Sequence, residues 1–410
     1  MNDYRAILEI ITEVLNGRNL NESFASNISE LNNIGKIKDV SYGLIRNYYI
    51  IKTIISDMVK NTPSDIRVVA ILYIGIYELE FTRKPAYAIS NDLVELAYQV
   101  TDDVKLKGFV NAIIRGFIRN KTSIVDAIKS KTEYKYNFPI WMISKLKAEY
   151  PRKYLDIMTN SSIEPKLALR INLRKTSVEQ YIKHLDNDSY TYVDNKIILN
   201  NSMKIQAIPL FKEGYVSIQD ISAQKLIEIA KPNEGDDVLD ACAAPGGKTC
   251  QLLENCNINL TSIDIDDERL NKVRQNLERL ELSAALINAD AAAWVSNKKY
   301  DFIVADVPCT ASGTMKRNPD IKLHRKQSDI AQFVRTQRKI VSNLWLMLKP
   351  GGRLVYITCS VFKEENHDNC EYFIEQLPMV KKISELNILP TEYADGFYYC
   401  VLGKEKHADL

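Results

Sequence analysis

The spacing of apolar residues changes twice along the chain. Residues 1–135 carry apolar side chains at helical spacing, as in ILEIITEVL, so we predict an all-helical region. Within it, Thr62-Pro63 and Asp102-Asp103 have the composition of helix starts, the second beginning a helix that runs to Ile118. A helical, Tyr-rich connector over residues 141–157 should follow.

Short strand patterns replace the helical spacing after residue 166. LALRINL and KIILN read as strands, with the helix-like TSVEQYIKHL between them, which predicts a small α+β module. From residue 217 strands and helices alternate, as in an α/β fold with a parallel, doubly wound sheet. The predicted domains are therefore residues 1–135, 136–216 and 217–410.

One strand in the last region runs into a glycine-rich turn and then a helix, in the sequence DVLDACAAPGGKT from Asp237 to Thr249. Such a turn brings bare backbone and a helix N-terminus close to a ligand. Its spacing fits neither the dinucleotide nor the P-loop fingerprint. A glycine pair at a strand-to-helix corner is also common as a purely structural turn. The turn is thus a candidate cofactor corner of unspecified type.

Three consecutive predicted strands downstream of this turn finish with a carboxylate, in Asp264, Asp290 and Asp306. Ligands of open α/β sheets bind outside the carboxyl ends of the strands, so these acids should line one crevice. Each acid alone fits equally well as a solvated strand end or a helix cap. Together with the glycine turn, they favour a ligand site.

Two cysteines fall at strand ends of the same crevice. Cys309 closes the segment Asp306-Val307-Pro308-Cys309, and Cys359 ends the strand GRLVYITCS. Lone cysteines are usually small buried apolar residues. A cysteine beside carboxylates and a cofactor turn is better placed to be a nucleophile. The spacing does not decide which of the two would attack.

Composition narrows the class of protein. The 410 residues are 46% apolar, which is enough for two or three hydrophobic cores. The longest apolar run, residues 68–77, is too short to cross a bilayer. The N-terminus lacks a signal-peptide layout, so we expect a cytoplasmic protein without a membrane partner. The seven cysteines contain no Cys-x-x-Cys pair, so neither a disulfide framework nor a zinc site is expected, and we predict no metal.

Charge is unevenly distributed although the net charge is only +2. Residues 105–135 hold eight Lys and Arg against two acids, and residues 316–339 hold the same numbers. Such runs usually decorate solvated faces. Two of them, one beside the candidate site, favour a track for a phosphate backbone.

Four segments carry a resemblance to a known family: DACAAPGGKT, DVPCTASGTMKRNPDIK, GGRLVYITCS and DGFYYCVLGK. They resemble the motifs of the RsmB (Sun/Fmu) family of RNA cytosine carbon-5 methyltransferases. The N-terminal third resembles the NusB-type RNA-binding domain of that branch, and the family places an RRM-like subdomain in the middle. The chain departs from the family at Val307, usually Ala, at Thr310, usually Ser, and at residues 88–91, where an acid is more usual.

The resemblance implies a Rossmann-like methyltransferase that uses S-adenosylmethionine. It assigns the ribose to Asp264 and the adenine edge to Asp290. The methionine part of the cofactor falls to the turn, which consists of Cys242, Ala243, Ala244, Pro245, Gly246, Gly247 and Lys248.

The resemblance also assigns the chemistry. Cys359 would be the nucleophile that adds to the cytosine ring, and Cys309 would assist proton removal and product release. Asp306, counted with the cofactor residues as well, would hydrogen-bond ring nitrogen 3. The implied substrate is ribosomal RNA, from the small subunit, with the target base unpaired or flipped out. We expect a monomer and no DNA partner.

Two other functions fit parts of the pattern. An RNA-binding scaffold with a decayed methyltransferase fold would have no need of Cys309 and Cys359. Amine methylation would predict an Asn/Asp-Pro-Pro-aromatic strand end, which residues 306–309 do not provide.

Overall fold

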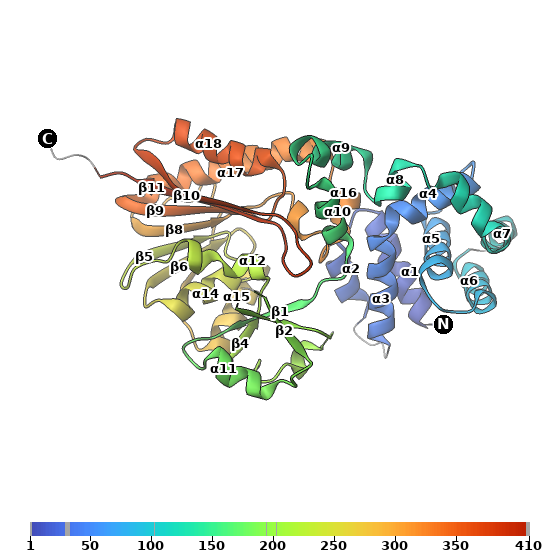
Figure 1. The fold of residues 1–410 in the computed structure, drawn as a ribbon, viewed down its shortest axis with the longest axis horizontal. Coiled ribbons are helices and arrows are strands. Elements are labelled where there is room, and N and C mark those ends of the chain that lie inside the picture. Colours follow the sequence, from blue (N-terminus) through green and yellow to red (C-terminus); the bar gives the residue numbers. More distant parts are fainter. Residues whose placement is uncertain (1, 29–32, 102, 194, 202, 407–410) are drawn as a thin grey trace. The chain divides into compact units, whose positions relative to one another are not determined.

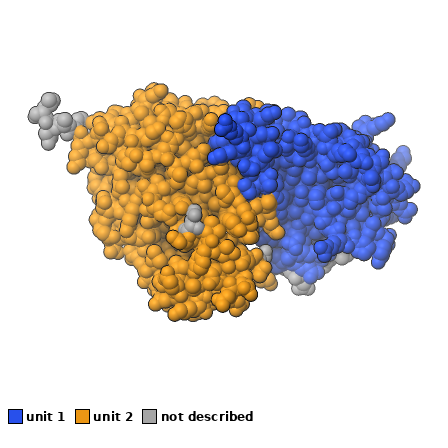
Figure 2. Space-filling model, viewed as in Figure 1, with its two compact units in different colours: residues 1–162, 315–325 blue, residues 163–314, 326–410 orange. Residues whose placement is uncertain are grey.

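The computed structural model describes residues 2–28, 33–101, 103–193, 195–201 and 203–406. It divides into two compact units, one of residues 1–162 and 315–325 and the other of residues 163–314 and 326–410 (Figure 2). None of the helices in these described ranges is long and apolar enough to cross a membrane.

The first unit is all-helical, as predicted (Figure 1). Its α5 is buried over most of its circumference and lies at the centre of one apolar core. The helices are α1 (Asn2–Leu15), α2 (Leu20–Asn27), α3 (Ile34–Arg46), α4 (Tyr48–Met58), α5 (Ile66–Phe81), α6 (Ala86–Val100), α7 (Val104–Ile128), α8 (Thr132–Tyr136), α9 (Ile140–Glu149), α10 (Tyr154–Ser162) and α16 (Ile321–His324).

Two predicted helix boundaries in this unit were wrong. Helix α5 begins at Ile66 rather than at Thr62-Pro63, because the Asp65 carboxylate caps it by accepting the backbone N–H of Arg67 at 2.9 Å. Helix α7 extends to Ile128, ten residues beyond the predicted end, with a non-helical residue at Asn120. Asp103 caps its start, as predicted, while Asp102 lies outside the described residues.

The segment of residues 315–325 is far from the rest of this unit in sequence but packs inside it. The Lys322 side chain is fully buried, and its Nζ donates hydrogen bonds to the carbonyls of Arg46 at 2.9 Å and Asn137 at 3.1 Å. The Tyr49 hydroxyl donates to the Lys322 carbonyl at 3.0 Å. Burial and the neighbouring Arg46 charge lower the pKa of Lys322 to about 7.

This packing corrects the interpretation of the second basic run. Lys316 and Lys322 are 1% and 0% exposed, so neither side chain contributes to a solvent-facing track for a phosphate backbone. A run of like charges in the sequence does not reveal which side chains have buried partners.

The substitution Lys322→Ala should destabilise the helical unit by ~2 kcal/mol, because the buried Asn137 carbonyl loses its donor and the Arg46 carbonyl keeps only the donor from the Asn137 side chain. Hydrogen exchange on peptides from α3 and α4, measured by mass spectrometry, should accelerate by about 30-fold where exchange follows opening of the unit. Lys60→Ala, at an exposed position of the same unit, is the matched control and should change exchange little. Equal exchange in the two variants would contradict this role of Lys322.

The second unit begins with a small antiparallel sheet in the order β2-β3-β1-β4. Its strands are β1 (Leu167–Ile171), β2 (Tyr190–Val193), β3 (Lys196–Leu199) and β4 (Val216–Ile218). The predicted helix TSVEQYIKHL is reduced to α11 (Val178–Tyr181) and the 3-10 turn η1 (Ile182–His184). A second 3-10 turn, η2, covers Ile205–Ala207. The predicted α+β module is confirmed.

A seven-stranded sheet forms the rest of this unit, in the order β10-β11-β9-β8-β5-β6-β7. Its first five strands in sequence run parallel to one another, and β11 runs antiparallel to its two neighbours, β9 and β10. They are β5 (Asp237–Ala241), β6 (Asn259–Asp264), β7 (Ala285–Asn288), β8 (Tyr300–Asp306), β9 (Leu348–Thr358), β10 (Val380–Ile388) and β11 (Phe397–Lys404). The predicted doubly wound sheet is therefore present.

Helices cover both faces of this sheet (Figure 1). One face packs against α17 (Gln327–Met347) and α18 (His367–Gln376). The other packs against α13 (Leu226–Ile229), α14 (Gly247–Asn255) and α15 (Asp267–Leu280), after the short α12 (Ile221–Gln224). The short turns η3 (Ser312–Thr314) and η4 (Lys363–Glu365) follow β8 and β9.

The direction of strand addition reverses at β5. The chain proceeds from β5 to β6 and β7 on one side, and then returns to place β8 and β9 on the other. A crevice for ligands forms at the carboxyl ends of the strands where this reversal occurs. The fold therefore places the candidate site at the ends of β5, β6 and β8.

Candidate functional site

The glycine-rich turn connects β5 to α14 through several unusual backbone conformations. Cys242 has φ of 59°, the Ala244–Pro245 peptide is cis, and Gly246 has φ of 97°. A Cβ at Gly246 would lie 3.1 Å from Val273 in α15. Glycine is needed there both for the left-handed conformation and for the close approach of α15.

The carboxylate of Asp264, at the end of β6, is directed at this turn. Its Oδ2 accepts the Ala244 backbone N–H at 3.0 Å, and its Oδ1 accepts that of Asp266 at 3.1 Å. Asp264 is only 3% exposed, whereas the next residue, Ile265, is 67% exposed. An exposed isoleucine beside a buried acid offers an apolar surface at the edge of the crevice, which sequence reasoning missed.

Asp290 lies two residues beyond the end of β7, which stops at Asn288 rather than at Asp290. It is exposed, and its Oδ1 accepts the backbone N–H of Ala292 at 2.9 Å. The parallel pairing of β6 with β7 puts this acid at the same sheet edge as Asp264.

Asp306, at the end of β8, forms an ion pair with Lys248 of the turn at 2.6 Å. Burial acts to lower the pKa of Lys248, but the charge and hydrogen bond of Asp306, together with other nearby negative groups such as Asp240, outweigh it, so the pKa is raised. The ammonium therefore stays charged beside Asp306. The pair joins the turn to the strand that leads to Cys309.

Cys309 and Cys359 meet between the ends of β8 and β9, with their Sγ atoms 3.4 Å apart. Cys309 is buried at 8% exposure and Cys359 is half-buried. The hydrogen bond with Cys359 and burial raise the pKa of the Cys309 thiol well above its ordinary value. The two predicted cysteines thus occupy one site but differ in access to solvent.

A buried glutamate, Glu365, holds the two cysteine loops together. Its Oε1 accepts the Thr310 backbone N–H at 2.8 Å, and its Oε2 accepts the hydroxyls of Thr310 and Ser360, both at 2.5 Å. Thr310 follows Cys309 and Ser360 follows Cys359. Gln337 of α17 also donates to Glu365 at 3.1 Å. Burial raises the pKa of Glu365 against the effect of these hydrogen bonds.

Asn366 and Gly313 complete the support of Cys359. Asn366 accepts the Thr358 hydroxyl at 2.5 Å and donates to the Ser360 carbonyl at 2.9 Å, so it braces both neighbours of the cysteine. The Gly313 N–H donates to the Cys359 carbonyl at 2.8 Å, and a Cβ there would lie 2.8 Å from that oxygen. Sequence reasoning missed Glu365, Asn366 and Gln337. The polar run after Thr-Cys-Ser was the one signal for Glu365 and Asn366, and Gln337 had none.

Asp240 lies under the turn, in the middle of the site's carboxylates. It is fully buried and accepts the Thr249 hydroxyl at 2.6 Å. Burial raises its pKa to about 7, assisted by the charges of Asp306 and Asp264 and opposed by Thr249 and Lys248.

This shift predicts a pH-dependent stability. Because the folded chain holds the Asp240 proton more tightly than the unfolded chain, the contribution is complete below the ordinary pKa of 3.8 and is lost as pH rises through about 7. In the variant Asp240→Asn the side chain at this position does not titrate. As pH rises from 3.8 to about 7, the free energy of unfolding of Asp240→Asn should therefore increase relative to that of the wild type, by up to ~1.4 kcal/mol per pH unit. Urea unfolding of both proteins at pH 5, 6, 7 and 8 measures this, and a constant difference would contradict it.

Two further features lie outside this site. His367, Glu371 and Glu385 are the one group in the described ranges that could hold a metal ion, but Lys382 already forms ion pairs with both glutamates. Cys370 of α18 and Cys400 of β11 form a disulfide. The sequence predicted no disulfide framework, and this pair was not foreseen.

Three family models match successive parts of the chain. Residues 227–402 match the family described as 16S rRNA methyltransferase RsmB/F. Residues 2–119 match the NusB family, and residues 138–206 match the RsmF/B-like ferredoxin-like domain.

Curated relatives match over most of their length. Ribosomal RNA small subunit methyltransferase B of Proteus mirabilis is 32% identical, covering 98% of this chain and 97% of its own. The protein of the same name from Shewanella oneidensis is 37% identical over 82% of each chain.

Solved structures support the fold. The crystal structure of PH0851 has a TM-score of 0.79 at 23% identity and covers 99% of this chain and 98% of its own. A methyltransferase homologue from Pyrococcus horikoshii has a TM-score of 0.58 at 24% identity and covers 66% of this chain and 97% of its own.

Proposed function

The chain belongs to the family of 16S rRNA methyltransferases RsmB/F, and we propose that it methylates carbon 5 of a cytosine through a covalent cysteine intermediate, with S-adenosylmethionine as methyl donor. The observation that carries this proposal is the pair of thiols 3.4 Å apart beside the Asp306–Lys248 ion pair. Two thiols and a carboxylate at the carboxyl ends of neighbouring strands suit a reaction that needs a nucleophile, a proton acceptor and a group that binds the ring.

The crevice residues fit the cofactor. The turn of residues 242–248 offers backbone and the N-terminus of α14 to its methionine part, with Asp264 for the ribose and Asp290 for the adenine edge. The exposed Ile265 side chain would pack against the adenine ring. When bound, the cofactor supplies an electrophilic methyl group on a positively charged sulfur.

Cys359 is the better placed nucleophile of the two cysteines. Carbon 5 of cytosine is a weak nucleophile, so a thiolate must first add to carbon 6 and make the ring electron-rich. Cys359 is half-buried and open to a base, and a negative charge on it is attracted by the Lys248 ammonium. Cys309 is buried with a raised pKa, so it remains a thiol near neutral pH.

The remaining groups would handle charge and protons on the ring. Asp306 would hydrogen-bond ring nitrogen 3 through the oxygen that Lys248 does not hold, stabilising the charge that develops there. Cys309 would then pass its own proton to the Cys359 thiolate as that sulfur leaves carbon 6, and would take up the carbon-5 proton in its place, so that both cysteines end as thiols.

Cysteine substitutions test this assignment. Cys359→Ala should abolish methyl transfer to a 16S rRNA transcript, because no thiolate adds to the ring, while binding of the cofactor survives. Cys309→Ala should accumulate a protein–RNA adduct that resists denaturation and is visible on a denaturing gel. Cys256→Ala, at the end of α14, is the control and should keep activity.

Exchanged phenotypes of the two variants would assign the attack to Cys309. Wild-type protein that binds RNA but transfers no methyl group would favour the alternative, an RNA-binding scaffold.

Helix α7 offers a surface for the RNA. Lys105, Arg115 and Arg119 are exposed at spacings that put them on one face, with the small Gly108 and Ala112 between them. Within the described ranges, none of the three cations forms an ion pair. Nearby, Lys107 lies over the ring of Tyr98, which is 54% exposed. Unpaired cations beside an exposed aromatic ring suit a phosphate backbone with unstacked bases.

The double substitution Arg115→Gln and Arg119→Gln should weaken RNA binding, because fewer phosphates are neutralised. The slope of log affinity against log salt should fall by about one unit for each phosphate that the variant no longer neutralises. Fluorescence anisotropy with a 16S rRNA transcript at several salt concentrations measures it. Lys129→Gln is the matched control, because Lys129 of the same basic run already pairs with Asp126 at 2.8 Å. An unchanged slope in the double variant would exclude this face.

A further inference from the structure

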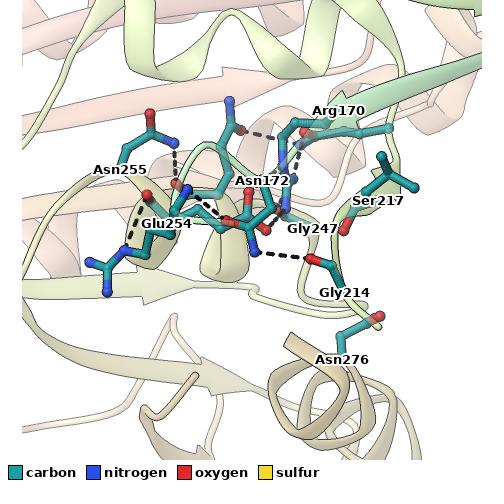
Figure 3. A network of polar contacts seen from close by, with 12 residues as sticks. Arg170, Asn172, Gly214, Ser217, Gly247, Glu254, Asn255 and Asn276 are labelled. Atoms are coloured by element: carbon teal, nitrogen blue, oxygen red, sulfur yellow. Dashed lines mark hydrogen bonds and ion pairs between the residues drawn. The ribbon is translucent and has the colours of Figure 1, made fainter. Parts of the chain in front are cut away.

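Arg170, in strand β1 of the small sheet, makes contact with both ends of α14. Its Nε and one terminal nitrogen donate to the two oxygens of Glu254 at 2.9 and 2.8 Å. The other terminal nitrogen donates to the carbonyl of Gly247 and to Gln219 Oε1, both at 2.7 Å. Figure 3 shows this network. The Arg170 and Glu254 residues are 5% and 4% exposed, so the pair is shielded from water.

The geometry of the helix explains why one guanidinium reaches both groups. Gly247 and Glu254 are seven residues apart, hence on the same face of α14 two turns apart. The long Glu254 side chain leans toward the N-terminus of the helix, which brings its carboxylate to Arg170. Arg170 therefore acts on the point where the turn becomes a helix.

We propose that Arg170 is a positioning residue for the cofactor turn: by holding the Gly247 carbonyl it fixes the turn of residues 242–248 for S-adenosylmethionine. This role rests on the proposed function. A buried ion pair contributes little net stability when compared with apolar packing, so fixing a geometry is the better account of its presence. The planar guanidinium can serve Glu254 and Gly247 at once, which a lysine cannot.

Side chains around Arg170 extend the support. Gln219, which accepts from Arg170, donates to Gln251 Oε1 at 3.2 Å, and Gln251 donates to the Gln224 carbonyl at 2.7 Å. Each of these glutamines is at most 9% exposed. The carbonyl of Gly247 thus sits in a fixed network that links the small sheet to α12 and α14.

A second arginine of the same segment provides a natural control. Arg174 donates to the carbonyls of Glu254 at 3.2 Å and Cys256 at 3.0 Å and to the Asn257 side chain at 2.9 Å. It therefore holds the C-terminal end of α14, away from the turn. Arg170 and Arg174 both dock the small sheet on this helix, but only Arg170 contacts the turn.

The test compares Arg170→Lys with Arg174→Lys in the full chain. Arg170→Lys should raise the Kd for S-adenosylhomocysteine, measured by calorimetry, and the KM for S-adenosylmethionine by about tenfold. Its kcat at saturating cofactor should change less than about threefold, because the reacting groups are untouched. Arg174→Lys should lower the melting temperature comparably but leave the Kd within about twofold. Glu254→Gln removes the charge that orients the guanidinium on Gly247, so its Kd should fall between those of the two arginine variants.

Equal Kd changes in the two arginine variants, or an unchanged Kd in Arg170→Lys, would reduce Arg170 to a structural role. If Arg170→Lys does not fold, Glu254→Gln decides: a Kd above that of Arg174→Lys supports the proposal, and a Kd equal to it overturns the proposal. Wild-type protein that binds no S-adenosylhomocysteine would overturn the proposed function itself.

Discussion

The arrangement of the site depends on the buried carboxylate of Glu365. Strands β8 and β9 are parallel neighbours, which brings the chain segments before Cys309 and Cys359 together. Pairing of strands does not orient the loops beyond their ends. Glu365 does so by accepting hydrogen bonds from the residue after each cysteine. Because Glu365 is buried, losing one of these hydrogen bonds would leave a polar atom without a partner and would cost stability. The separation of the two thiols is therefore a property of this network.

Arg170 and Glu365 show the same use of a charged group away from the reacting atoms. Each is buried, each satisfies several polar partners, and each fixes a segment that carries no regular hydrogen-bonding pattern of its own. Arg170 contacts the turn of residues 242–248, and Glu365 contacts the loops that carry the two cysteines. Lys248 connects the two segments, because it belongs to the turn and pairs with Asp306. The crevice is thus assembled by ion pairs and hydrogen bonds between loops, on a sheet held by apolar packing.

Local patterns in the sequence were enough to predict the turn, the acids that end β6 and β8 and the two cysteines, because each belongs to one strand and the residues after it, whereas the strand predicted to end at Asp290 stops at Asn288. They predicted the α+β module and the doubly wound sheet for the same reason. Glu365 and Arg170 were missed because their partners lie up to 84 residues away in sequence. The burial of Lys316 and Lys322 was missed because local charge density does not show which carbonyls a lysine will meet.

The membership of residues 315–325 in the helical unit affects the order in which the protein can fold during synthesis. Leu323 packs against the apolar core of α1 to α7, and Lys322 fills donor positions for two carbonyls of that unit. A ribosome finishes residues 1–162 long before it reaches residue 325. Until most of the second unit has been made, the helical unit therefore lacks the Lys322 hydrogen bonds and the Leu323 packing. The helical unit therefore receives its last segment, residues 315–325, only after the segment that carries Cys309 has been synthesised.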